Sequence, residues 1–272
     1  MPHACLLQEL CTVQFPQQYV TRNGTRSPAL PVYFPLTKSK HDMMTDWDKV
    51  AETRWGSYII DVENAVVLRA QAWAKKPLLA IDLGCGSGRW SKLLTKLGWV
   101  ATCVDVDPQA LEVCQHNNPG AKCILASPTG ATIPCDSCSA ALLLCIEVAS
   151  VIESAWFPPE LSRVLEPEGL FIGVQLNRRS WRGMAVRLKY FLTRSQDRNL
   201  FYTSSYGDWR RKIAETGFEM LHEEGFCWAP FQRDSDSALI PFFTKMERCL
   251  GLPRLVGLSP WVVFIARKRA GL

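Results

Sequence analysis

Short apolar runs alternate with amphipathic stretches along most of the chain, and this alternation predicts an α/β protein. Residues 78–81 and 140–146 are almost wholly apolar, as strands buried on both faces of a parallel sheet are. Further strands are predicted for residues 100–104, 123–126, 170–176, 218–223 and 261–266. We therefore expect a mostly parallel sheet with helices between its strands.

Apolar side chains recur at helical spacing between the predicted strands. After the first apolar run, Trp90, Leu93, Leu94 and Leu97 share one helical face, and Gly98 ends the helix. The same spacing predicts further helices at residues 45–62, 66–73, 108–117, 159–165 and 205–215. Strand, helix and strand in this order form βαβ units, whose strands run parallel.

Three stretches fall outside this core pattern. Residues 1–42 lack sustained periodicity and contain several prolines, so we expect an N-terminal arm or lid before one domain over residues 43–272. Residues 177–203 form a first insert, with one apolar and one basic helical face; the basic residues suit an anionic substrate, an RNA backbone, a membrane surface or a plain solvated face. Residues 229–259 form a second insert, which carries an apolar stripe made of Leu239, Phe242, Phe243, Met246 and Leu250.

The first predicted strand runs into a glycine-rich loop, Gly84-Cys85-Gly86-Ser87-Gly88, with Asp82 two residues before it. The next strand ends on Asp105. Such a loop lets the backbone approach a ligand closely, and an acid at the end of the second strand can bind ribose hydroxyls. A dinucleotide fingerprint, GxGxxG, would need a third glycine where this chain has Arg89, so the spacing does not favour a nicotinamide cofactor.

This acid and glycine spacing resembles the first motif of class I S-adenosylmethionine-dependent methyltransferases, and residues 133–136 and 165–170 resemble later stretches of the ubiquinone-biosynthesis type. The resemblance implies a Rossmann-like, seven-stranded sheet with helices on both faces and an antiparallel last strand. It also implies an S-adenosyl-L-methionine site. There Asp82 would hold the amino-acid end, Asp105 would pair with the ribose hydroxyls, and Ser127 would stand where relatives have an acid for the adenine. The loop would contribute Gly84, Cys85, Gly86 and Gly88, and Val106 would also bind the cofactor.

Glu147 follows the central apolar strand, at the edge of the sheet where α/β proteins bind ligands. An acid at this position suits the cofactor's methyl group, but it equally suits a backbone contact or a helix cap. A hydroxyl acceptor would need a base, and the candidates by position along this edge are His222, Glu147 and Tyr206.

Several residues are candidates for the acceptor site. By resemblance, the helices before the first strand fold over the cofactor, so aromatic side chains there suit a substrate mouth or equally the packing of helix on sheet. The candidates are Trp47, Trp55, Tyr58, Arg178 and Phe243. For the stripe that includes Phe243, the alternatives are packing on the domain and roofing an apolar pocket.

Composition limits the class of protein, its cellular compartment and the metal sites that can be expected. The chain has 272 residues, of which 47% are hydrophobic and 21% charged, as in an ordinary globular protein, and its net charge of +5 is mild. No run of about 18 apolar residues is present, and eleven cysteines without a secretory signal indicate a reducing compartment, so we expect a cytoplasmic protein. Cys135 and Cys138 have no second pair at zinc spacing, so we expect plain thiols and no metal site.

These observations favour a methyltransferase that transfers the methyl group of S-adenosylmethionine, in line, to a small, partly apolar molecule. Methyl transfer from a sulfonium depends more on alignment than on any one catalytic group, which fits the lack of a nucleophile motif. The alternatives are an RNA methyltransferase, which would need a basic strip with exposed aromatic residues, and a non-catalytic S-adenosylmethionine-binding protein.

Overall fold

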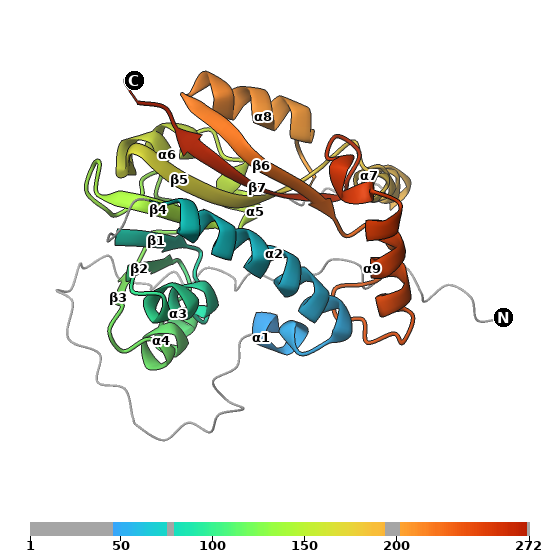
Figure 1. Ribbon diagram of the computed structural model, residues 1–272, viewed down its shortest axis with the longest axis horizontal. Coiled ribbons are helices and arrows are strands. Elements are labelled where there is room, and N and C mark those ends of the chain that lie inside the picture. The colour runs from blue at the N-terminus through green and yellow to red at the C-terminus, as the bar shows by residue number, and fades with distance from the viewer. Residues whose placement is uncertain (1–45, 75–78, 194–201, 271–272) are drawn as a thin grey trace, which may run out of the picture. The chain divides into compact units, whose positions relative to one another are not determined.

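The computed structural model describes residues 46–74, 79–193 and 202–270 (Figure 1). The N-terminal arm expected for residues 1–42 lies outside the described residues. The strands are β1 Leu79–Leu83, β2 Val100–Asp105, β3 Lys122–Leu125, β4 Ala140–Cys145, β5 Leu165–Leu176, β6 Phe218–Phe226 and β7 Trp261–Lys268. The helices are α1 Asp46–Ala51, α2 Arg54–Trp73, α3 Arg89–Lys96, α4 Pro108–Asn117, α5 Ala149–Ile152, α6 Phe157–Val164, α7 Trp181–Thr193, α8 Tyr206–Glu215, α9 Ile240–Cys249 and a 3-10 turn, Leu252–Arg254.

The strands form one seven-stranded sheet in the order β3-β2-β1-β4-β5-β7-β6. Neighbouring strands from β3 to β5 pair in parallel, whereas β7 runs antiparallel to both β5 and β6. The predicted Rossmann-like sheet with an antiparallel last strand is therefore confirmed. β4 is buried along its whole length, as its apolar sequence predicted.

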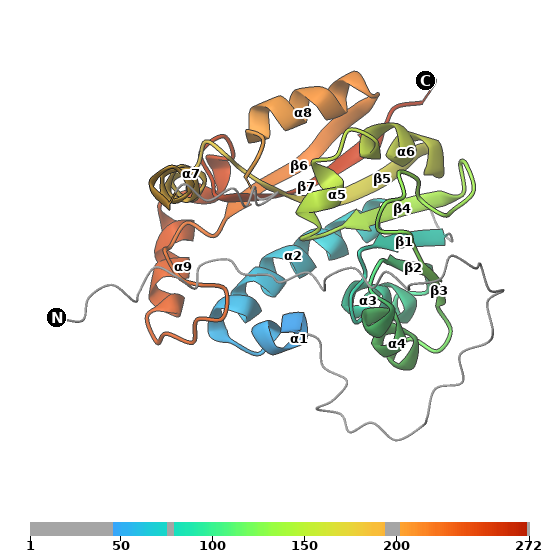
Figure 2. The same ribbon diagram turned by 180° about the vertical axis from the view of Figure 1, so that it is seen from behind.

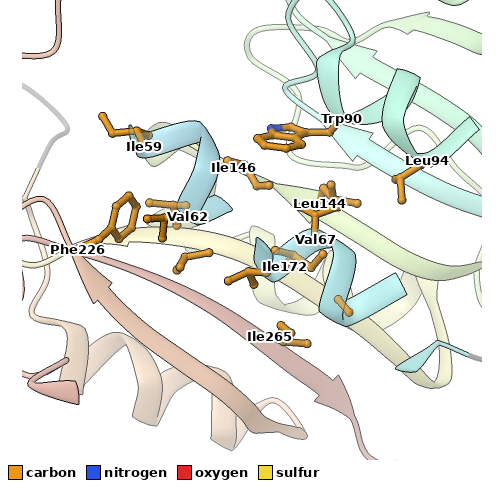
Figure 3. Close-up of a cluster of buried hydrophobic side chains, with 14 of the residues drawn as sticks. Ile59, Val62, Val67, Trp90, Leu94, Leu144, Ile146, Ile172, Phe226 and Ile265 are labelled. Carbon is orange, nitrogen blue, oxygen red and sulfur yellow. The ribbon is translucent and has the colours of Figure 1, made fainter. Parts of the chain in front are cut away.

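Helices cover both faces of the sheet. On one face, α2 and α3 bury a cluster with the sheet that includes Val62, Leu94, Leu144, Ile172 and Ile265 (Figure 3). On the other face, α6 and α8 contribute Phe157, Leu161, Tyr206 and Trp209 to a second buried cluster. The sheet is thus the middle of three layers, which leaves the carboxyl edge of its parallel strands for ligands.

The helix before the first strand differs from the sequence-based expectation. Two stretches, 45–62 and 66–73, were expected, whereas the structure has a short α1 and then one 20-residue helix, α2. Thr53 caps α2 because its side-chain oxygen accepts a hydrogen bond from the Gly56 N–H at 3.0 Å. Its buried face is continuous, so nothing in the packing interrupts it.

The two inserts form α7 and α9. These helices and the 3-10 turn lie at the same end of the sheet in both views (Figures 1 and 2). α7 follows the carboxyl end of β5, and α9 follows that of β6. Both inserts therefore flank the edge at which a ligand is expected.

Candidate cofactor and acceptor site

The glycine-rich loop has one open side. Gly84, Gly86 and Gly88 all have positive φ angles, of 75°, 52° and 78°. A side chain at Gly84 would lie 2.3 Å from Val148, and one at Gly88 would lie 2.3 Å from the Asn118 amide. A Cβ at Gly86, in contrast, would meet nothing within 4 Å. The loop is packed on two sides and leaves room for a ligand in front of Gly86.

Asp105 fixes the open part of this loop. One of its oxygens, Oδ2, accepts the Gly86 N–H at 2.8 Å, and Oδ1 accepts those of Val106 and Asp107 at 2.7 and 3.0 Å. A carboxylate offers about four lone-pair sites, so these three bonds leave acceptor capacity for a ribose hydroxyl. The carboxylate and the open face of Gly86 lie together, as the cofactor site predicted from sequence requires.

Asp82 holds the helix that follows the loop. Its Oδ2 accepts hydrogen bonds from the Ser91 N–H at 3.1 Å and the Ser91 hydroxyl at 2.7 Å. Burial raises the pKa of Asp82 to about 7, and the Ser91 hydrogen bonds oppose this rise. Asp82 is almost fully buried, so its expected contact with the amino-acid end of a cofactor stays a prediction.

The Cys85 side chain turns away from the open side of the loop. It is buried against α4 and β2, where its sulfur lies within 4.8 Å of the Cys103 and Cys114 sulfurs. Cys85 can therefore line a cofactor through its backbone, while its thiol belongs to the packing beneath the loop. Cys123 adds a fourth thiol, 3.8 Å from that of Cys114.

Glu147 meets an arginine from the second insert at the carboxyl end of β4. It has a φ of 62°, a left-handed conformation that is uncommon for a residue other than glycine. Arg233 forms an ion pair with its carboxylate and lies over the Trp47 ring, 3.6 Å from the ring centroid. Val148, the next residue, packs on Gly84, so this ion pair stands beside the glycine-rich loop.

Glu63 lies close to the same pair, on α2, and is only 1% exposed. Burial raises its pKa well above the usual range, the Glu147 carboxylate adds to this rise, and Arg233 opposes it. Among the described residues, three buried polar atoms of this group have no hydrogen-bond partner: Glu63 Oε1, Glu147 Oε1 and Arg233 Nε. Buried groups of this kind are normally satisfied, so they mark a place for a ligand or water.

Helix α1 closes the site from the other side. Asp48 accepts a hydrogen bond from the Ser87 hydroxyl at 2.7 Å and lies 3.5 Å from the Arg89 guanidinium. Ser87 belongs to the glycine-rich loop, and Trp47 precedes Asp48. The start of the described chain is therefore joined to both the loop and the Arg233 guanidinium.

The other two candidate bases lie in different surroundings. His222 contacts Arg69 at 2.8 Å and Glu224 at 3.4 Å, in the middle of β6. Tyr206 is 2% exposed in the second core cluster and donates a hydrogen bond to Glu223 at 2.7 Å. Burial raises the pKa of Tyr206, as does the Glu223 carboxylate. These placements favour structural roles, and the catalytic roles stay predictions.

The predicted acceptor residues on α2 and α9 are mostly engaged in packing. Trp55 is 2% exposed, with its ring centroid 4.8 Å from that of Tyr58. Tyr58 donates a 2.7 Å hydrogen bond to the buried Glu247 carboxylate. Phe243 packs on the first core cluster, with its ring 5.6 Å from that of Phe231.

The remaining predicted residues are more exposed. Val106 is half exposed after Asp105, and Ser127 is exposed with its hydroxyl 3.2 Å from that of Thr129. They follow the carboxyl ends of β2 and β3, which suits the cofactor contacts predicted for them. Arg178 is exposed and donates to the Thr203 carbonyl at 3.3 Å.

Sequence reasoning missed Asp48, Glu63 and Arg233. Glu63 gave one usable signal, because it falls on the otherwise largely apolar buried face of α2. Asp48 and Arg233 reach the site through folding alone: Arg233 is 86 residues from Glu147 along the chain.

The comparisons with known proteins agree with this geometry. Residues 81–173 match a family described as a methyltransferase domain. The uncharacterized methyltransferase YodH of Bacillus subtilis is 32% identical over 114 residues, which cover 41% of this chain and 48% of that protein. The chain thus spans about half the length of the curated relative that it matches.

Solved structures share the fold. A putative sarcosine dimethylglycine methyltransferase from Galdieria sulphuraria is similar with a TM-score of 0.54 at 16% identity, over 78% of this chain and 85% of that one. Geranyl diphosphate C-methyltransferase from Streptomyces coelicolor, solved with S-adenosyl-L-homocysteine, is similar with a TM-score of 0.55 at 12% identity, over 76% of each chain.

Residues 81–173 therefore match a methyltransferase domain, and the fold around them is that of the similar methyltransferase structures. The comparisons support the S-adenosylmethionine-dependent methyltransferase family and the cofactor that were predicted from the sequence. None of the helices in the described ranges has both the length and the apolar content needed to cross a bilayer.

Proposed function

We propose that the protein transfers the methyl group of S-adenosylmethionine to a small, partly apolar molecule. The observation that carries this proposal is the group of buried polar atoms without partners at Glu63, Glu147 and Arg233, next to the glycine-rich loop. An acceptor with one or two polar groups would satisfy these atoms. The Trp47 and Trp261 rings, which lie 3.6 and 5.3 Å from the Arg233 guanidinium, supply apolar surface around them.

The cofactor fits the residues present. The open face of Gly86 would accept it, the Asp105 carboxylate would accept hydrogen bonds from its ribose hydroxyls, and Val106 and Ser127 would lie toward its base. When bound, S-adenosylmethionine supplies an electrophilic methyl group on a sulfonium. The chain's own contribution is to align the acceptor and exclude water, because in-line transfer depends on close approach.

Glu147 is the group best placed to take a proton from a hydroxyl acceptor. Its carboxylate lies beside the glycine-rich loop. Arg233 pairs with one carboxylate oxygen, and the other, Oε1, has no hydrogen-bond partner among the described residues. Burial raises the pKa of Glu63 well above its usual range, which favours the protonated form that can donate a hydrogen bond to the acceptor. The site thus combines two carboxyl groups and one guanidinium, of which Glu63 is buried and the other two are partly buried.

An experiment with labelled cofactor tests this proposal. The purified chain is incubated with methyl-labelled S-adenosylmethionine and either a small-metabolite extract or total RNA. Label in a small product that partitions into organic solvent supports the proposal. Label in RNA would replace it with RNA methylation, and cofactor binding without any transfer would leave a non-catalytic binding protein.

A pair of acid variants then tests the site. Glu147→Gln should lower the rate of transfer by about 100-fold, the usual contribution of a positioned base, with cofactor affinity nearly unchanged. Glu219→Gln is the matched control, because Glu219 pairs with Arg267 near the start of β6, at the opposite edge of the sheet. If His222→Ala lost activity and Glu147→Gln kept it, the base would be His222.

A further inference from the structure

The apolar stripe of α7 faces solvent. Met184, Leu188, Phe191 and Leu192 recur at the spacing of one helical face, and they are 56%, 58%, 80% and 69% exposed. Gly183 is the only buried residue among those described in α7. Amphipathic helices normally bury this stripe on their own domain, so α7 is mounted with the opposite orientation.

α9 repeats this arrangement at the same end of the molecule (Figures 1 and 2). Its buried side is Ile240 and Glu247, whereas Phe242 and Leu250 are 64% and 63% exposed. Leu239, just before the helix, is 59% exposed. The α9 stripe was expected either to pack on the domain or to roof a pocket. Most of its residues do neither. Of its residues, Phe243 packs on the core and the others face outward.

Specific hydrogen bonds fix the orientation of α7 on the domain. The Arg182 guanidinium turns inward and donates to the carbonyls of Cys227 at 3.1 Å, Phe231 at 2.9 Å and Ala229. The Trp181 indole N–H donates to the Trp228 carbonyl at 3.0 Å. These bonds hold the helix by its polar side, so the outward direction of its apolar stripe is built into the fold.

The exposed charged side chains on the two helices are basic, whereas the exposed acids Asp234 and Asp236 lie in the loop before α9. No acidic residue occurs between positions 170 and 193, while Arg187 and Lys189 lie on either side of the α7 stripe. On α9, Lys245 and Arg248 are exposed, whereas the acid Glu247 is buried. Apolar side chains flanked by basic residues suit a surface that is apolar beneath and negatively charged on top.

We propose that α7 and α9 rest on an anionic phospholipid bilayer, with their exposed apolar side chains inserted among the acyl chains and their basic residues at the headgroups. We call this region the α7–α9 surface. RNA fits it less well, because most of the exposed apolar side chains, such as Met184, Leu188 and Leu192, offer no ring for base stacking, although Phe191 and Phe242 do. A second copy of this chain would bring two basic surfaces together, which like-charge repulsion opposes.

Vesicle binding of the full chain tests this proposal without cofactor or acceptor, so its failure is separate from that of the proposed function. Cosedimentation is compared between phosphatidylcholine vesicles and vesicles that also contain phosphatidylserine, at low and high salt. We expect binding to the mixed vesicles that weakens as salt screens the charges. The double variant F191S/L192S should bind at least about tenfold more weakly.

The control is Val100→Ser, which changes an apolar side chain that is 65% exposed at the start of β2, away from the α7–α9 surface. All these side chains face solvent, so the melting temperature should stay the same in every variant. Absence of vesicle binding, or equal binding by F191S/L192S, would overturn the proposal. So would a wild-type dimer that F191S/L192S converts to a monomer, or tighter binding to RNA than to the mixed vesicles.

Discussion

Because Gly86 has an open face, one added methyl group there can test cofactor binding separately from the stability of the fold. Gly86→Ala places a Cβ where the structure has nothing within 4 Å, in the space that the cofactor would fill. The loop cannot easily move away, because Asp105 holds the Gly86 N–H at 2.8 Å. We expect the dissociation constant of S-adenosylhomocysteine to rise at least tenfold, equivalent to about 1.4 kcal/mol.

Gly98→Ala is the matched control for backbone strain. Gly98 also has a positive φ, 88°, and a Cβ there also meets nothing within 4 Å. Both substitutions force a non-glycine residue into the left-handed region, which costs about 1–2 kcal/mol. Gly98→Ala should therefore lower the melting temperature about as much as Gly86→Ala does, and leave cofactor affinity alone.

Gly88→Ala should behave in the opposite way to Gly86→Ala. Its Cβ would lie 2.3 Å from the Asn118 amide and 2.5 Å from the Cys114 sulfur, so the packing beneath the loop must shift. The main effect should be on stability. Titration calorimetry measures the cofactor affinity of the three variants, and thermal unfolding measures their stability. Unchanged affinity in Gly86→Ala, or an equal loss of affinity in Gly98→Ala, would refute this placement of the cofactor.

Two further predictions concern stability. Burial raises the pKa of Asp82 to about 7, so between about pH 4 and pH 7 the folded state keeps a proton that the unfolded state has released. The free energy of unfolding should therefore fall as the pH rises through this range. Denaturant titrations across the range should show a flatter slope for Asp82→Asn. Arg182→Ala should lower the free energy of unfolding by about 1.5–3 kcal/mol, since its guanidinium bonds three carbonyls, whereas Arg187→Ala on the exposed side should change it by less than about 0.5 kcal/mol in the same assay.

The sheet and the loop could be predicted because their signals are local. A buried central strand such as β4 has to be apolar throughout, and positive φ angles require glycine or nearly so. Asp105 could be placed because the end of one parallel strand lies beside the end of the next. These features depend on neighbouring residues or on strand order, and both can be read from a pattern.

The acceptor side could not be predicted in the same way. Arg233 and Glu147 meet across a large sequence separation, and no periodicity marks an ion pair between a loop and a strand end. His222 was placed near the carboxyl edge because the predicted strand ended at residue 223. β6 in fact continues to Phe226, which moves His222 to the middle of the strand.

The direction of the α7 stripe shows a different limit. Helical periodicity identified correctly which residues share a face, but it cannot say whether the domain covers that face. The direction depends on where Arg182 finds acceptors, and these are carbonyls of residues 227–231, far along the chain. Until those partners are known, the usual assumption that an apolar stripe is core is the natural one.

A short chain of contacts joins α7 to the place where methyl transfer is proposed. Arg182 holds the Phe231 carbonyl, and Arg233, two residues further on, pairs with Glu147. A displacement of α7 must therefore move the group that neutralises Glu147. If α7 settles into a bilayer, the lipid would change how Arg233 is placed against that carboxylate. The protein would then be an interfacial catalyst, with a turnover rate that depends on the surface beneath it.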